Sequence, residues 1–317
     1  MTRIRDQRGQ TLVLSIVFMT VLLGMAAAVL DVGSWYRADR AAQAAADAAA
    51  LAGAQALPYD TGRASGLAYE YSGKNGSGID GVSFPAGKLV PNDTIKVEFS
   101  RPAPGFFARL FGLDSVTVRA TATARASNIT QAKWVAPIVV NEKHPMLTCQ
   151  PSPCFGEATE LKYYHLKDGG GGSKKDDDPA VDGGSGSFGF INLIQAGGNP
   201  GTSELGNWIR NGFDAYMPLG EYDARTGNPF SSSNVNGSLQ DRIGTEILFP
   251  VYRKLTGSGS NAKYEIIGWV GFHLTGMDLQ GNNEKLFGYF TQVIWEGIES
   301  ETGAEPEFGV RTINLVE

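Results

Sequence analysis

An uncharged apolar segment near the N-terminus constrains this chain more than any other feature. Leu12 to Leu30 contains 19 residues, and eleven of them are Leu, Ile, Val or Phe. As a helix it spans roughly 28 Å, close to the ~30 Å thickness of a bilayer's hydrocarbon core. A core helix of a soluble protein would need a polar face, and this segment has none. The sequence therefore predicts a single membrane crossing, anchored by residues such as Leu12, Phe18, Leu22 and Leu30.

Charge around this span gives a modest signal for its orientation. Three arginines precede the span, at positions 3, 5 and 8, whereas two follow it within ten residues. Because Lys and Arg favour the cytoplasmic side, we expect the N-terminus in the cytoplasm and the C-terminal residues outside. Ala26 to Ala28 would suit a signal-peptide cleavage site, which is the alternative. The apolar stretch is longer than a usual signal peptide's and continues into helix, which favours an anchor.

An alanine-rich segment follows the span. Eleven of the 16 residues from Ala41 to Ala56 are alanine, the best helix former, and no proline occurs before Pro58. We expect the membrane helix to continue outward through residue 57 as a stalk. Small residues recur at Ala41, Ala45, Ala49 and Gly53, a spacing that lets another backbone approach closely. The sequence leaves two alternatives for this stripe: packing against the chain's own head, or against partner helices.

Several motifs occur together in this region at regular distances. They are Arg8-Gly9-Gln10, the apolar span, Asp31-Val-Gly33, Trp35-Tyr36, Arg40 and the run from Ala44 to Ala54. Their combination resembles the N-terminal signature of the Flp (tight-adherence) pilus-assembly TadE/TadG-like proteins, with Arg8, Gly9 and Gln10 as the prepilin-like turn. The segments Phe106–Asp114 and Val116–Thr123 resemble the end of the same module. The resemblance implies a pilin-like or pilus-associated envelope protein, with other pilus-assembly or pilin-like helices as partners.

Two departures narrow what the resemblance implies. Substrates of prepilin peptidases resemble one another in a Gly before the cut and a Glu five residues after it. Here Gly9 would precede the cut and Leu14 occupies the position of the Glu. The pattern therefore argues against processing at Gly9 and favours a helix that stays in the membrane. Some TadG-type relatives also carry a DxSxS metal loop, and none occurs in this sequence, so we predict no bound metal.

The next region, residues 58–130, reads as a small α+β module. Thr61 to Tyr71 is expected to form a short helix. Apolar and polar residues alternate from Ile95 to Phe99 and from Val116 to Ala124, the period of strands with one buried face. We expect Phe106 to Phe111 to form an apolar turn that caps this sheet. A long helix with a small antiparallel sheet is the pilin-like plan.

Residues 131–317 read as a β-rich extracytoplasmic domain, in keeping with the 41 glycines of the chain. Tyr264 to Leu274 is apolar on both faces, which predicts a central strand covered on both sides. The other expected elements are strands at Trp134–Val140, Phe188–Ile194, Ile247–Tyr252 and Leu286–Trp295, and a helix at Glu204–Phe213. Residues 168–187 are rich in Gly, Ser, Lys and Asp and predict a flexible insertion. Its Asp176–Asp178 and Asp182 lack the Gly and Glu placement of an EF-hand, so a solvated loop is favoured.

The chain has two cysteines, Cys149 and Cys154, with prolines between them. Outside the cytoplasm, two nearby cysteines favour a disulfide. Free thiols are the alternative, and zinc is disfavoured because no further cysteine or paired histidine completes a site. A loop this short would stabilise the fold by about 2 kcal/mol in the chain-entropy model.

A search for catalytic and cofactor motifs yields little. The three histidines, at positions 144, 165 and 273, form no metal-binding spacing, and no GxSxG, Walker A or dinucleotide motif occurs. His273 ends the central strand and is expected to be structural. Glu246 and Glu265 are the only carboxylate pair we single out, without a motif to support them. The net charge of −6 disfavours nucleic acid as a partner.

The sequence thus predicts an α+β chain with three parts: a transmembrane anchor and stalk (1–57), a pilin-like module (58–130) and a β-rich domain (131–317). The leading functional hypothesis is a non-enzymatic, cofactor-free component of Flp pilus assembly or surface adherence, in a bacterial cytoplasmic (inner) membrane. One alternative is a signal-anchored module that binds a cell-wall or surface ligand, and another is a surface hydrolase. For the binding module, a groove would be lined by Phe188, Phe190, Trp208, Tyr216, Trp269, Phe272 and Trp295, although most of these residues are expected in the core.

Overall fold

A computed structural model describes residues 8–75, 78–149, 153–163, 187–194, 198–257, 261–280, 284–303 and 305–316. The chain forms two compact units. Unit 1 comprises Met1–Ala126 together with Ile313–Glu317, and unit 2 comprises Ser127–Thr312. The fold class is α+β, with a long N-terminal helix followed by mixed sheets.

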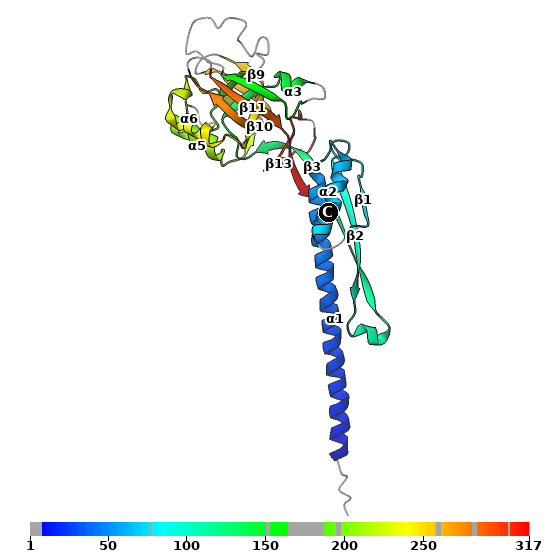
Figure 1. The fold of residues 1–317 in the computed structure, drawn as a ribbon. Helices are drawn as coiled ribbons and strands as arrows, with labels where there is room; N and C mark the ends of the chain where they lie inside the picture. Colours follow the sequence, from blue (N-terminus) through cyan, green and yellow to red (C-terminus); the bar gives the residue numbers. More distant parts are fainter. Residues whose placement is uncertain are drawn as a thin grey trace, which may run out of the picture. The chain divides into compact units, whose positions relative to one another are not determined.

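Helix α1 (Arg8–Ala54) dominates unit 1. It runs for 47 residues without a break, so the apolar span and the alanine-rich segment form one helix, the long blue ribbon of Figure 1. Both halves lack proline and consist largely of Ala, Leu and other good helix formers, which explains the continuity. The chain turns at residues 55–59, around Pro58, which cannot continue a helix.

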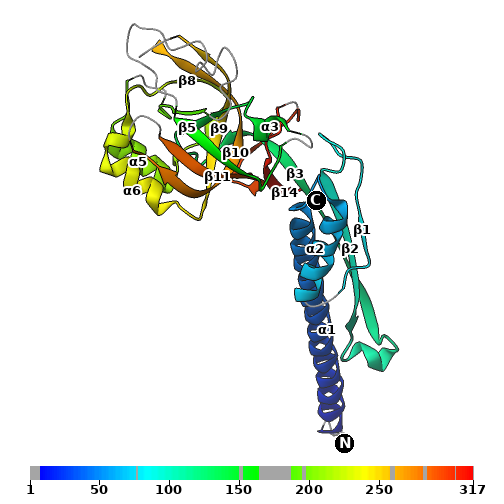
Figure 2. The same ribbon diagram turned by 45° about the horizontal axis from the view of Figure 1, so that its top comes forward.

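A second helix and an antiparallel sheet pack on the outer half of α1. Asp60 caps helix α2 (Thr61–Lys74) by accepting a hydrogen bond of 2.8 Å from the Arg63 amide. The sheet contains β1 (Gly81–Ser83), β2 (Thr94–Pro104) and the first part of β3 (Ser115–Ala132), paired in that order, with η1 (Ala108–Phe111) at the tip of the β2–β3 hairpin. Figures 1 and 2 both show this hairpin running alongside α1.

The C-terminus of the chain returns to unit 1. Val316 donates its amide to the carbonyl oxygen of Thr123 at 2.8 Å, and Ile313 packs against the core of this unit. No local signal in the sequence indicates this contribution, because Ile313 lies almost 200 residues from the β3 segment that it joins. The expected domain boundaries at 57/58 and 130/131 stay predictions.

Unit 2 is built on a barrel of six strands. Pairing runs in the order β11, β5, β6, β4, β9 and β10, and β10 pairs in turn with β11, which closes the ring. Two pairings, β5–β6 and β4–β9, are parallel and the others are antiparallel. The strands are β4 (Ile138–Asn141), β5 (Ala158–Tyr163), β6 (Ser187–Phe190), β9 (Glu246–Thr256), β10 (Lys263–Asp278) and β11 (Lys285–Thr291).

Further elements lie outside this barrel. Helices α5 (Thr202–Asn211) and α6 (Ser233–Asp241) pack against each other, and α6 also contacts β10. The remaining pieces are β7 (Met217–Pro218), β8 (Gly220–Asp223), β12 (Val293–Ile294), β13 (Gly297–Glu299), β14 (Val310–Leu315), η2 (Pro229–Ser231) and the short helix α3 (Pro145–Thr148). From Ile266 to Phe272, β10 is buried at every position, as its apolar sequence indicates.

One expected strand begins later than its apolar sequence suggests. Trp134 was expected to start a strand, but its φ of 59° lies in the left-handed region, where a bulky residue cannot continue a strand. Its amide donates to the Phe213 carbonyl and its indole donates to Glu296, both at 2.9 Å. These contacts hold the bend, and the strand starts at Ile138 instead.

Candidate functional site

The first candidate site is the apolar half of α1. The segment is long and apolar enough to cross a membrane, and it is not buried against any part of the chain that the structure describes. Leu12, Phe18, Leu22 and Leu30 all expose about half or more of their surface. A surface of this kind on a soluble protein would be costly in water, whereas in lipid it requires no protein cover. Arg8, Gly9 and Gln10, expected as a turn, are the first helical residues of α1.

Asp31 follows this segment directly and joins it to the hairpin tip. One carboxylate oxygen accepts hydrogen bonds from the amides of Phe106 at 2.7 Å and Phe107 at 3.2 Å. The other accepts from Phe107 at 2.9 Å and from Ala108. The residue is only 3 % exposed, although its charge would ordinarily keep it in water. Three amides on one carboxylate form an anion-binding turn that fixes the hairpin to the helix.

Further contacts run along the same helix and hairpin. The Trp35 indole donates to the Pro104 carbonyl at 3.3 Å, and Arg101 donates to the Ala38 carbonyl at 3.5 Å. Ile95 approaches Gly53 at the far end. From Gly53 to Trp35 a helix rises roughly 27 Å, and from Ile95 to Pro104 a strand covers roughly 30 Å. The two elements therefore run antiparallel over equal lengths, and the tip lies at the end of the apolar span.

The apolar turn at the hairpin tip does not cap the sheet, contrary to the expectation from its sequence. Phe106, Phe107, Leu110 and Phe111 are exposed, and Leu110 and Phe111 expose more than four-fifths of their surface. The core beneath the sheet is already closed by alanines of α1 and by Val97 and Phe99. No interior space is left for the phenylalanines, so they point outward.

The small-residue stripe on α1 packs within unit 1. Ala45 and Ala49 are buried in its core, and Gly53 is buried against α2 and β2. A Cβ at Gly53 would lie 2.9 Å from the Ala64 carbonyl oxygen and in collision with the Ile95 side chain. Of the two alternatives, these three residues follow the first: they serve the chain's own packing. Ala41 is exposed and takes no part in it.

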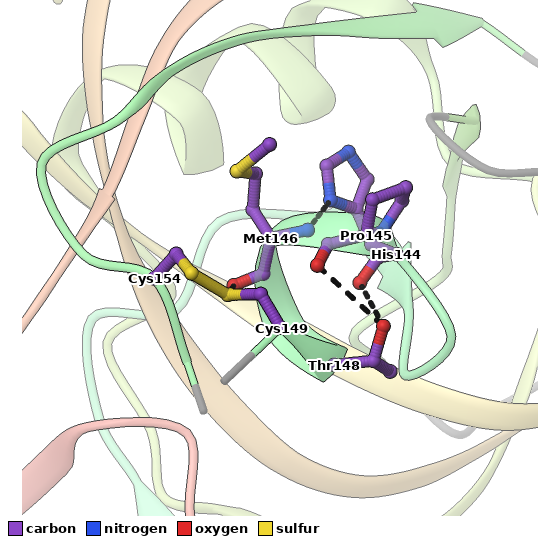
Figure 3. Close-up of a disulfide and its surroundings, with 6 residues drawn as sticks. All are labelled: His144, Pro145, Met146, Thr148, Cys149 and Cys154. Carbon is purple, nitrogen blue, oxygen red and sulfur yellow. Dashed lines mark hydrogen bonds between the residues drawn. A yellow bond between two sulfur atoms is a disulfide. The ribbon is translucent and has the colours of Figure 1, made fainter. Parts of the chain in front are cut away.

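In unit 2, both cysteines follow a short capped helix, α3 (Figure 3). Cys149 and Cys154 form a disulfide with a Cα–Cα distance of 5.9 Å. Next to them, Nδ1 of His144 accepts a hydrogen bond of 3.1 Å from the Met146 amide and so caps α3. The His144 ring packs edge-on against Phe290, with centroids 5.1 Å apart. Burial lowers the pKa of His144 to about 4, so the imidazole is neutral at pH 7.

Glu246 and Glu265, the carboxylates singled out without a supporting motif, do not lie together. Glu246 is paired in register with His273, whereas Glu265 is paired with Lys254. Since His273 and Glu265 are eight positions apart on β10, the two carboxylates lie roughly 26 Å apart along the strand. His273 stacks on Tyr289, and its Nδ1 lies 3.0 Å from Glu246 Oε1. This hydrogen bond lowers the pKa of the Glu246 carboxyl.

The aromatic residues considered for a ligand groove are mostly core. Five are buried: Phe188, Phe190, Trp208, Trp269 and Phe272. Trp295 donates its indole hydrogen to the Lys133 carbonyl at 2.6 Å, and only Tyr216 of the seven is exposed. A cavity beside Trp269 has a volume of about 10 Å³, which admits one water molecule at most. Most of these residues therefore belong to the core of unit 2.

Two further sequence-based expectations lie outside the described residues. These are the calcium alternative at Asp176–Asp178 with Asp182, and almost all of the insertion 168–187. Within the described residues, no three His, Cys, Asp or Glu side chains gather as metal ligands. Sequence reasoning missed the role of Asp31 and of the hairpin tip. The available signal was an acidic residue directly after the span together with four large apolar residues in the turn predicted at Phe106 to Phe111.

Comparison with protein families bears on the N-terminal helix. Residues 9–56 match the model of the Flp pilus-assembly TadE/G-like family. This segment is similar to that family. The match coincides with α1 and its following turn and ends before α2, so the similarity lies in the helix and not in unit 2. No curated protein and no solved structure matches the chain.

Proposed function

We propose that this chain is a single-pass, non-enzymatic component of Flp pilus assembly, held in the bacterial cytoplasmic (inner) membrane with both units outside. The observation that carries the proposal is the coincidence of two features in one helix. The TadE/G-like match covers residues 9–56, and the same helix exposes an apolar surface of bilayer length. The similarity to a pilus-assembly family and the candidate membrane span thus fall in the same helix, which supports the proposal.

The outer half of α1 acts in this proposal as a stalk that belongs to a pilin-like module. Its small residues are covered by α2 and the β1–β2–β3 sheet of the same unit. Partner helices of the pilus apparatus would then contact α1 elsewhere, either at the exposed apolar span or on the outer face that includes Ala41 and Ala44. The disulfide between Cys149 and Cys154 suits an oxidising compartment outside the cytoplasm.

An in-frame deletion of the gene, with pili counted by electron microscopy and adherence measured on the same cells, tests this function. We expect pili and adherence to be lost or strongly reduced, and both to return when the full chain is supplied in trans. Normal pili together with lost binding to a surface ligand would instead support the ligand-binding alternative. Normal pili with normal adherence would refute the proposal.

A further inference from the structure

The tip of the β2–β3 hairpin carries a compact exposed apolar surface, which we call the tip patch: Phe106, Phe107, Leu110, Phe111 and Leu113. Five large apolar side chains within eight residues are exposed together. Outside the apolar half of α1, up to Val32, the other exposed large apolar residues of the described parts are tyrosines or aliphatic residues. Patches of this kind mark a contact with an apolar partner, because leaving them in water is unfavourable.

The position of the tip patch within unit 1 indicates what that partner is. The amides of Phe106, Phe107 and Ala108 bind the carboxylate of Asp31, which is one residue beyond the end of the span at Leu30. The patch is therefore level with the outer end of the span, where hydrocarbon gives way to headgroups. Trp35, one turn further out, has the amphipathic side chain that concentrates at membrane interfaces.

Several backbone amides of the tip are also hydrogen-bonded within unit 1, as an environment poor in water requires. Besides the three amides on Asp31, the turn satisfies its own groups: Leu110 donates to Phe107 at 3.0 Å, and Gly112 donates to Arg109 at 3.1 Å. Leu113 donates to Ala108 at 3.1 Å. An amide that enters an apolar phase without a partner is costly, so this degree of pairing removes the main barrier to insertion.

The charged residues of the tip suit the same position, at the outer interface of the membrane. Arg109 and Asp114 flank the apolar residues, and the Arg109 Nε lies 3.6 Å from the Asp114 carboxylate, with both side chains exposed. A long arginine side chain beside an apolar surface extends its guanidinium toward headgroups while its neighbours enter the acyl region. The tip therefore combines an apolar face with polar edges, as interfacial segments do.

We propose that the tip patch inserts into the outer interface of the membrane that α1 crosses, so that unit 1 is held by two elements and not by α1 alone. This inference rests on the proposed membrane anchor. Continuity with the span favours lipid as the occupant over a second copy or another pilus protein. Asp31 then fixes the depth of the tip and satisfies three amides there.

Spin labels on single introduced cysteines test the insertion in the full-length chain, with the native disulfide intact, in vesicles of phosphatidylethanolamine and phosphatidylglycerol. Labels replace Phe111 in the tip, Leu22 in the span and Gln55 at the outer end of unit 1. Collision rates with oxygen, which concentrates in lipid, and with a water-soluble nickel chelate are measured at each. We expect the label at Phe111 to favour oxygen as Leu22 does, with nickel collisions severalfold lower than at Gln55.

Three results would overturn the inference and are distinguishable from one another. If Leu22 reports lipid but Phe111 resembles Gln55, the anchor stands and the tip lies in water. If Phe111 is immobilised and shielded from both reagents, a protein covers it. If Leu22 itself is accessible to the nickel chelate, the proposed anchor fails and the inference fails with it.

A second measurement tests the role of Asp31. We expect Asp31→Ala to increase nickel collisions at the Phe111 label, because the tip loses its fixed depth. Asp39→Ala removes an exposed acidic residue two turns further along α1 and serves as the matched control, with no expected change. Equal effects of the two substitutions, or no effect of either, would contradict this role.

Discussion

The close packing of α1 on α2 predicts a strong difference between two chemically identical substitutions. Gly53 lies in α1 against α2, and a methyl group there would lie 2.9 Å from the Ala64 carbonyl oxygen and in collision with Ile95. Gly66 lies in α2 of the same unit, and a methyl group there would meet nothing within 4 Å. We therefore compare Gly53→Ala with Gly66→Ala.

The expected magnitude follows from two opposing effects. Either replacement gains roughly 1 kcal/mol of intrinsic helix propensity, so this gain cancels in the comparison. Only Gly53→Ala forces neighbours apart, and the backbone of Ala64 cannot rotate away as the end of the Ile95 side chain can. Overpacking of this kind costs about 1–3 kcal/mol. Gly53→Ala should therefore make unit 1 less stable than Gly66→Ala by about that amount.

Amide hydrogen exchange of the β2 amides in the full-length chain measures this difference within unit 1 and does not require the two units to unfold together. The expected difference corresponds to about 5- to 150-fold faster exchange in Gly53→Ala than in Gly66→Ala. Equal protection in the two variants, or greater protection in Gly53→Ala, would refute the close packing of α1 on α2.

Three further predictions concern the hydrogen bonds between Asp31 and the hairpin tip, which we call the Asp31 clasp, the buried histidine and the disulfide. Asp31→Asn should speed exchange of the tip amides, whereas Asp39→Asn should leave them unchanged; unchanged exchange in both would contradict the clasp. Burial sets the pKa of His144 at about 4, against about 6.5 when unfolded, so the unfolded state binds more protons between these values. Unit 2 should keep its full stability above pH 6.5 and lose about 3 kcal/mol as the pH falls to 4. The variant His144→Asn keeps a cap without a titrating ring, so denaturant titrations should show a weaker dependence of its stability on pH. An unchanged dependence in this variant would contradict the role of His144. Replacing Cys149 and Cys154 by serine should lower the stability of unit 2 by about 2 kcal/mol in the chain-entropy model, and no change on reduction of the native protein would contradict this.

Much of unit 1 could be predicted because its signals are local. Helix α1 follows from a long proline-free segment, apolar in its first half and rich in alanine in its second, and β2 and β3 follow from strict alternation around Val97 and Val118. The family match on residues 9–56 confirms the resemblance seen in the N-terminal motifs. Signals of this kind depend only on neighbouring residues, so they can be recognised without any knowledge of tertiary structure.

The Asp31 clasp could not be predicted, because it depends on residues far apart in the chain. The carboxylate and the amides that it binds are 75 to 77 positions apart. Taken alone, an aspartate after an apolar span is indistinguishable from an ordinary solvated charge. The partner of the Ala45–Gly53 stripe was ambiguous for the same reason, since small residues permit close approach without specifying what approaches.

The closed barrel of unit 2 could not be predicted from the sequence either. Strands β9, β10 and β11 have strong apolar patterns, but closure needs the short strand β5, whose six residues include Glu160 and Lys162. Helix α6 contains Asn, Gly and Ser, which are weak helix formers, and forms because Ser232 caps it and α5 packs on it. In both cases tertiary contacts outweigh local preference.

The requirement for the membrane anchor is tested most directly by counting pili in deletion cells that receive one of two chains at equal levels. One is the full chain, and in the other a cleavable signal peptide replaces residues 1–30, so that the protein from Asp31 onward is exported but released from the membrane. We predict that the full chain restores pili and that the released protein does not. Full restoration by the released protein would contradict a membrane-anchored role in pilus assembly.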